Sequence, residues 1–178
     1  MFIKRICYPV TSLGPGNRVA IWLTGCNKNC TGCMSSDLKD MDAGKDISVS
    51  KILKVIHSIN GKIDGITISG GEPFLQPLEL LELIQGMKKI TEDIIVFSGY
   101  DVNEILERKE YKRIVDEIAI LIAGEYVDSL NDKKGLRGSS NQKILILKPH
   151  KKYDNLENQT RTMQSYQYED SVLLIGIP

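Results

Sequence analysis

Isoleucine-rich stretches that run into glycine-containing loops constrain this chain more than any other feature of its sequence. Residues 65–69, 94–97 and 118–122 each precede such a loop, and segments with helical spacing lie between them. Strands this apolar are typical of a parallel sheet that is shielded from water. The pattern predicts an α/β fold with mainly parallel strands, in a sheet covered on both sides or curved into part of a barrel.

The N-terminal part predicts a β-hairpin-like entry to this sheet. Residues 2–10 and 18–24 are rich in strand-forming side chains, and the turn between them contains Gly14, Pro15 and Gly16. The second of these strands leads directly to Gly25 and the cysteines that follow it.

Helices are predicted after three of the strands or turns. Ser48 is a suitable N-cap for residues 49–60, where Ile52, Val55, Ile56 and Ile59 fit one apolar stripe. Pro77 opens a helix over 78–90, and Asp101 caps one over 102–108.

The C-terminal part is expected to extend the same domain. Residues 143–147 predict a strand, residues 148–170 are polar, and residues 172–175 predict a last strand returning to a sheet edge. We expect a single domain over 1–178, with 148–178 as an extension or sheet-edge segment.

Composition excludes several classes of protein. Lys plus Arg and Asp plus Glu both number 23, so no net charge points to nucleic acid or a membrane surface. No apolar run approaches the length of a membrane span, and the N-terminus lacks the layout of a signal peptide. Four cysteines, three of them clustered, favour a reducing cytoplasmic location over a disulfide framework.

The clustered cysteines Cys26, Cys30 and Cys33 indicate a metal centre. Their spacing, three and then two intervening residues on one loop, lets three thiols converge. A structural zinc site would need a fourth ligand, for which Cys7, His57 and His150 are the candidates. A [4Fe-4S] cluster held by three cysteines would leave one iron open to a small molecule.

A second motif follows the next strand. Gly70 and Gly71 permit close approach of the backbone to a ligand, while Glu72 and Pro73 present a carboxylate and exposed carbonyls to a cation such as an ammonium. Because ligands gather at the carboxyl ends of parallel strands, this motif and the cysteine loop are expected to meet. A cluster with an open iron beside a pocket for an α-amino acid head group describes a site for S-adenosylmethionine (SAM).

This pairing of motifs resembles the radical SAM superfamily. The resemblance implies that Cys26, Cys30 and Cys33 bind a [4Fe-4S] cluster and that residues 70–73 contact SAM. It implies that Gly70, Gly71, Glu72 and Pro73 are all cofactor-binding residues. Ser98 and the backbone at 123–124 are further candidates, for the ribose and the methionine carboxylate. No catalytic side chain beyond the cluster and SAM is implied.

Within the superfamily the chain is similar to the small activating enzymes of glycyl-radical proteins, particularly those of anaerobic ribonucleotide reductase. The similar segments are residues 14–16, 22–26, 66–73, 98–100 and 137–142. The likeness implies a partial (βα) barrel and a 5′-deoxyadenosyl radical that abstracts hydrogen from a glycine of the partner protein. It also implies an external one-electron donor such as flavodoxin or ferredoxin.

The chain departs from the activating enzymes at two places. Met34, Ser35, Ser36 and Asp37 stand where those enzymes usually have an aromatic residue or histidine and then asparagine, and Ala123 replaces an aspartate before Gly124. An alternative is therefore a stand-alone radical SAM enzyme that modifies a peptide, nucleotide or other small molecule. A zinc-stabilised interaction module is a third, non-enzymatic possibility.

Overall fold

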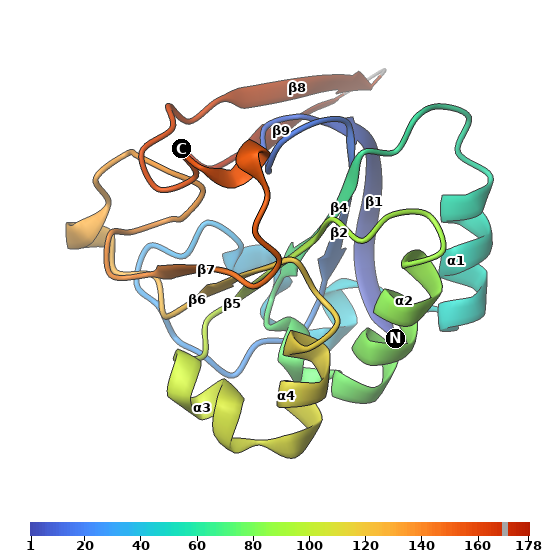
Figure 1. Cartoon of the computed structure of the whole chain (residues 1–178), viewed down its shortest axis with the longest axis horizontal. Helices are drawn as coiled ribbons and strands as arrows, with labels where there is room; N and C mark the ends of the chain where they lie inside the picture. Colours follow the sequence, from blue (N-terminus) through green and yellow to red (C-terminus); the bar gives the residue numbers. More distant parts are fainter. Residues whose placement is uncertain (169–170) are drawn as a thin grey trace.

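The central sheet dominates the computed structural model, which describes residues 1–168 and 171–178 (Figure 1). Its strand order is β3-β1-β2-β4-β5-β6-β7, and β2, β4, β5 and β6 run parallel while β1, β3 and β7 are antiparallel to their neighbours. The strands are β1 Phe2–Val10, β2 Arg18–Leu23, β3 Lys45–Asp46, β4 Gly65–Gly70, β5 Ile94–Ser98, β6 Ile120–Ala123 and β7 Lys143–Ile146. The predicted α/β class, the mostly parallel central sheet and the hairpin-like entry are confirmed.

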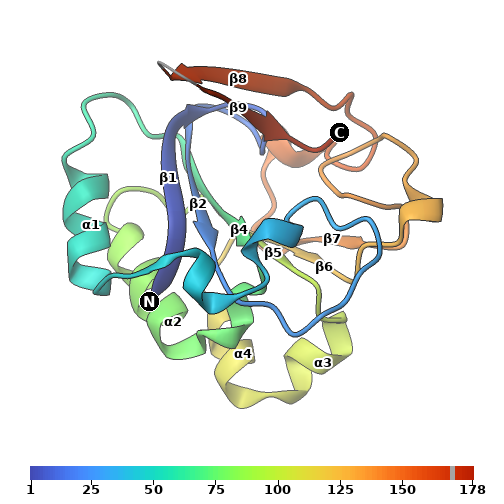
Figure 2. The ribbon, with the colours of Figure 1, turned by 180° about the vertical axis from the view of Figure 1, so that it is seen from behind.

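In the described residues, four α-helices cover one face of this sheet (Figures 1 and 2). They are α1 Val49–His57, α2 Pro77–Met87, α3 Val102–Glu107 and α4 Lys109–Val115. The helices α1, α2 and α3 begin at or within one residue of their predicted starts, whereas no separate helix was predicted at α4. Asp101 forms a capping box with Glu104. The predicted stripe of α1 is wrong at Val55, which is 51% exposed, whereas Ile52 and Ile56 are buried in the core.

The alternation of side chains along the parallel strands divides the core into two layers. In β2, Val19, Ile21 and Leu23 face the helices, while Ala20 and Trp22 belong to the cluster on the opposite face. The same alternation along the neighbouring strands explains why they are apolar on both sides. Each face of the sheet is covered by other parts of the chain.

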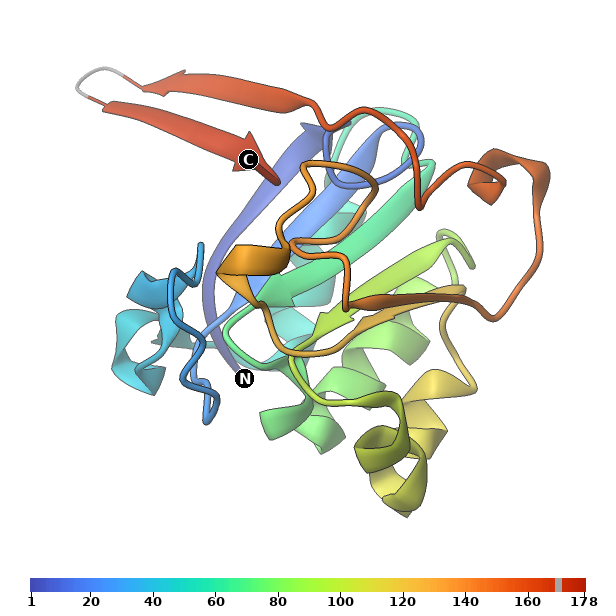
Figure 3. The same cartoon turned by 90° about the vertical axis from the view of Figure 1, so that its left-hand side faces the viewer.

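The opposite face is covered by loops and by a C-terminal hairpin of β8 (Met163–Tyr168) and β9 (Ser171–Gly176) (Figure 3). These two strands pair only with each other among the described residues. The expectation that residues 172–175 return to a sheet edge is therefore wrong. The reason is that Ile175 and Ile177 are buried against the face of the sheet, where they pack near Ile120 and Ile122.

No closed barrel forms among the described residues, because β3 and β7 end the sheet on opposite sides and do not pair.

A buried ion pair holds the start of β2: Arg18 is fully buried and its guanidinium lies 2.9 Å from the Asp93 carboxylate. None of the helices in the described part of the chain is long and apolar enough to cross a lipid bilayer.

Candidate functional site

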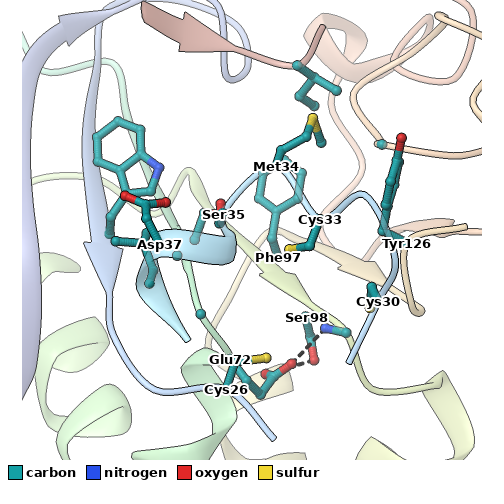
Figure 4. A pocket seen from close by; sticks show the side chains of 18 of the residues that line it. Cys26, Cys30, Cys33, Met34, Ser35, Asp37, Glu72, Phe97, Ser98 and Tyr126 are labelled. Carbon is teal, nitrogen blue, oxygen red and sulfur yellow. Dashed lines mark hydrogen bonds between the residues drawn. The ribbon is translucent and has the colours of Figure 1, made fainter. Parts of the chain in front are cut away.

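A cavity of about 410 Å³ opens at the carboxyl ends of the parallel strands, on the face of the sheet away from the helices. Cys26, Cys30 and Cys33 all line it, so the structure brings the three predicted ligands around one space (Figure 4). The predicted SAM-binding residues Gly70, Gly71, Glu72 and Ser98 line the same cavity. Pro73 does not line it; this proline is buried at the start of the 3-10 turn Pro73–Leu75.

The cysteine loop is closed at its base by the backbone. The amides of Gly25 and Cys26 donate to the carbonyls of Leu38 and Lys39, at 2.9 and 2.8 Å. Gly25 has a φ of +92°, a conformation that favours glycine and turns the chain out of β2. The loop therefore leaves the strand sharply and returns to it, which positions the cysteines over the strand ends.

Two glycines at the end of β4, Gly70 as its last residue and Gly71 directly after it, allow the chain to approach itself. A Cβ at Gly70 would lie 2.1 Å from the backbone oxygen of Leu23, and one at Gly71 would lie 2.2 Å from that of Gly25. The amides of Gly71 and Glu72 donate to these same two oxygens, at 2.9 and 2.7 Å. Gly70 is thus needed for close contact with the end of β2 and Gly71 for contact with the cysteine loop, a reason that the sequence analysis did not anticipate.

Glu72 is the most constrained charged group in the cavity. It is fully buried, and its carboxylate accepts hydrogen bonds from the amides of Phe74 and Gly99, at 3.0 and 2.7 Å, and from the hydroxyl of Ser98, at 3.0 Å. Burial raises the pKa of this carboxyl to about 7, although these hydrogen bonds oppose the rise. A carboxylate has about four acceptor positions, so the three donors leave room for one more.

Ser98 supports Glu72 from β5. Its hydroxyl donates to the Glu72 carboxylate and accepts from the amide of Tyr100 at 3.0 Å. The hydroxyl proton of Ser98 is therefore already engaged in a hydrogen bond within the protein. Its predicted contact with the ribose of SAM remains a prediction.

Lys28 is a cavity residue that the sequence analysis missed. Its ammonium lies 3.4 Å from the Glu104 carboxylate, 3.1 Å from that of Glu125 and 4.7 Å from the centre of the Tyr100 ring. These contacts tie the cysteine loop to Tyr100 after β5, to α3 and to the loop after β6. The position of a lysine between Cys26 and Cys30 was the available signal.

Residues 137–142 form another wall of the cavity through Gly138 and Gln142. The Gln142 side chain accepts from the amide of Gly138 at 2.7 Å and donates to the carbonyl of Gly124 at 2.7 Å. Gly124 also lines the cavity and has a φ of +121°. The segment therefore holds the loop after β6 in place and also forms part of the cavity lining.

The three thiols of the cysteine loop fit a [4Fe-4S] cluster better than a structural zinc ion. Cys26, Cys30 and Cys33 are free thiols, and the described residues contain no group of three or more Cys, His, Asp or Glu side chains arranged around a single ion. A structural zinc ion needs four donors at about 2.0 to 2.3 Å, whereas the thiolates of a [4Fe-4S] cluster bind separate irons. Three free thiols spread around one cavity fit the cluster.

The fourth zinc ligands considered from the sequence lie elsewhere. Cys7 is buried in β1 opposite Ala20, His57 ends α1, and His150 packs against Tyr153. None of these three residues lines the cavity. The zinc alternative consequently lacks a fourth ligand from this set.

Comparisons with known proteins identify the family. A family model described as a 4Fe-4S single cluster domain matches residues 12–145. The anaerobic ribonucleoside-triphosphate reductase-activating protein of Escherichia coli K12 is 31% identical over 147 residues, which cover 77% of this chain and 94% of that protein. The chain belongs to this family of activating proteins.

Other members of the family are equally similar. The protein of the same name from Haemophilus influenzae is 31% identical, with 77% of this chain and 93% of the relative covered. That from bacteriophage T4 is 31% identical over 137 residues, with 74% and 85% covered. The predicted resemblance to the activating enzymes and the predicted [4Fe-4S] domain are confirmed, while the individual SAM contacts remain predictions.

Proposed function

We propose that this protein is a radical SAM enzyme that activates a glycyl-radical protein, namely an anaerobic ribonucleoside-triphosphate reductase. In this proposal Cys26, Cys30 and Cys33 hold one [4Fe-4S] cluster, and SAM binds beside it against Gly70, Gly71 and Glu72. The sheet around the cavity would be a partial (βα) barrel, and the 178 residues would form one domain.

The observation that carries this proposal is the joining of the two motifs. Backbone hydrogen bonds from Gly71 and Glu72 to the oxygens of Leu23 and Gly25 fix the loop after β4 against the cysteine loop. A ligand between them would contact the cluster on one side and the backbone and carboxylate of Glu72 on the other. This is the arrangement that an α-amino acid head group requires, since it has an ammonium and a carboxylate on one carbon.

When bound, the cluster and SAM would supply the one-electron cleavage of SAM to methionine and a 5′-deoxyadenosyl radical. The residues of the chain position and protect that chemistry. The free acceptor position of Glu72 would receive the ammonium of SAM, and the new positive charge would lower the pKa of this carboxyl from its value of about 7.

The hydrogen donor would be the Cα of a glycine in the reductase. The cavity lies on the face of the sheet opposite the α-helices of the described residues and is partly open to solvent, which leaves a path for a polypeptide segment. The electron would come from an external protein donor such as flavodoxin or ferredoxin. Trp22 and Phe97 supply apolar surface to the cavity, which shields a radical from water.

Anaerobic reconstitution with iron and sulfide tests the proposal, with Cys26→Ala and Cys7→Ala as a matched pair. Wild type and Cys7→Ala should bind about four irons per chain and form 5′-deoxyadenosine when reduced with SAM, because Cys7 lies outside the cavity. Cys26→Ala should do neither. Equal iron binding by the two variants, or no 5′-deoxyadenosine from the wild type, would overturn the proposal.

A further inference from the structure

The C-terminal hairpin supplies a wall of the candidate site from outside the family match. Residues 173–177 line the cavity, although the match to the 4Fe-4S domain ends at residue 145. Within β9, Ile175 is buried and Leu173 packs against the core cluster on this face, so these two side chains point at the sheet. Leu174 points the other way and is 63% exposed at the edge of the cavity.

The hairpin is anchored on the turn after β1. The Ser12 hydroxyl donates to the carbonyl of Ile175 at 2.9 Å, and the Gln164 side chain donates to the carbonyl of Pro9 at 2.9 Å and accepts from the amide of Thr11 at 3.0 Å. Hydrogen bonds to Ile175 of β9 and to Gln164 of β8 therefore hold the hairpin in place. The wall is a fixed part of the site.

A second exposed apolar residue lies on the cysteine loop. Met34 lines the same cavity and is 44% exposed. In Figure 4 its side chain points away from Cys33 and toward the ribbon of the C-terminal hairpin. Its terminal methyl lies near Gly138, 3.2 Å from the position that a Cβ would occupy there. Met34 is also the first residue at which the sequence analysis expects a difference from the activating enzymes.

Two exposed apolar side chains from separate parts of the chain thus border one cavity. Single exposed apolar residues need no explanation, but Met34 and Leu174 both border the space in which a substrate must lie. Glycine has no side chain to recognise, so an enzyme that selects one glycine must contact the residues beside it in the sequence. An apolar rim favours apolar neighbours in that segment.

We propose that Met34 and Leu174 form an apolar rim that binds the polypeptide segment flanking the target glycine and determines which glycyl-radical protein is accepted. This inference rests on the proposed function. The occupant is a segment of the partner protein with apolar side chains next to its glycine. The rim contacts that segment and takes no part in holding the cluster or SAM.

Val172 provides a matched control for Leu174. Both side chains lie on the outer face of β9, two residues apart, and Val172 is 62% exposed, but only Leu174 lines the cavity. Leu174→Asp and Val172→Asp therefore place the same charge on the same strand at equal exposure. A general effect of the charge on the hairpin would appear in both variants.

The test measures the binding of each reconstituted full-length variant to a fluorescently labelled anaerobic ribonucleoside-triphosphate reductase from the same organism, under anaerobic conditions. Leu174→Asp should raise the dissociation constant by about tenfold or more, since it brings a carboxylate into an apolar contact. Val172→Asp should change it by less than about twofold. Met34→Gln, which keeps the side-chain length, should also weaken binding.

Equal dissociation constants for Leu174→Asp and Val172→Asp, with matching melting temperatures and iron contents, would overturn the inference. So would a wild-type protein that does not bind the reductase. Formation of 5′-deoxyadenosine by the wild type reports on the proposed function separately. A clear difference in binding without that product would support the rim and contradict the proposed chemistry.

Discussion

Replacing Arg18 with methionine should destabilise the protein strongly, because the Arg18 side chain is fully buried. The guanidinium makes six hydrogen bonds, three to Asp93 and one each to Thr67, Pro15 and Ile66. Methionine fills similar space but donates nothing. It would leave the Asp93 carboxylate, whose side chain is 4% exposed, with Lys152 as its remaining cation at 2.7 Å.

The magnitude follows from the cost of leaving a buried charge without its main partner, about 3 to 5 kcal/mol. In a chain of this length each kcal/mol lowers the melting temperature by about 2 to 4 °C, so the expected fall is roughly 6 to 20 °C. Circular dichroism of the anaerobically purified protein measures it. Lys112→Met, which removes an exposed helical ion pair with Asp116, should change the melting temperature by less than about 2 °C.

The way in which this loss of stability in Arg18→Met changes with pH provides a second check on the role of the ion pair. Burial opposes ionisation of Asp93, but the hydrogen bonds and charge of Arg18 outweigh it and hold the pKa of this carboxyl below its ordinary value. The stabilisation is therefore complete above the unfolded pKa of about 3.9 and is lost as the pH falls through the lower folded pKa. The difference in melting temperature between the wild type and Arg18→Met should become smaller below about pH 4. A variant no less stable than Lys112→Met at pH 7 would refute the reasoning.

Two further substitutions test the joining of the loops. Gly71→Ala should lower stability by about 1 to 3 kcal/mol and reduce the iron bound on reconstitution, because its Cβ would meet a backbone oxygen of the cysteine loop at 2.2 Å. Gly99→Ala, whose Cβ would meet the side chains of Lys28 at 3.3 Å and Glu72 at 3.4 Å and no backbone atom closer, should be milder, and equal iron loss in both variants would contradict this account. Ser98→Ala should cost about 1 to 3 kcal/mol by leaving the amide of Tyr100 without its acceptor, and a melting temperature equal to that of the wild type would refute this. Ser50→Ala, at an exposed position of α1, is the control for Ser98→Ala and should show no loss.

The parts of the fold that local patterns specify could be predicted from the sequence. The ends of β4 and β5, the cap at Asp101 and the proline at the start of α2 are all local features, and each appears at or within one residue of its expected position. The meeting of the cysteine loop with residues 70–73 was also predictable, because parallel strands place their carboxyl ends at the same edge.

The position of the C-terminal hairpin could not be read in this way. Its strands alternate in a manner that fits a sheet edge as well as a separate hairpin, and the choice depends on Ile175 packing against strands about 50 residues earlier. The role of Lys28 was missed for a similar reason, since its partner Glu104 lies in α3 and its partner Glu125 lies in the loop after β6, both far along the chain. The contacts of Gly70 with the end of β2 and of Gly71 with the cysteine loop likewise required the pairing of β2 with β4.

The most direct test of the proposed function follows one hydrogen atom. The anaerobic reductase is labelled with glycine deuterated at Cα and incubated with the reconstituted, reduced protein and SAM, and the 5′-deoxyadenosine is examined by mass spectrometry. We expect deuterium in the 5′-deoxyadenosine together with a glycyl-radical signal in the electron paramagnetic resonance spectrum of the reductase. The formation of 5′-deoxyadenosine without deuterium, and with no radical on the reductase, would contradict the account.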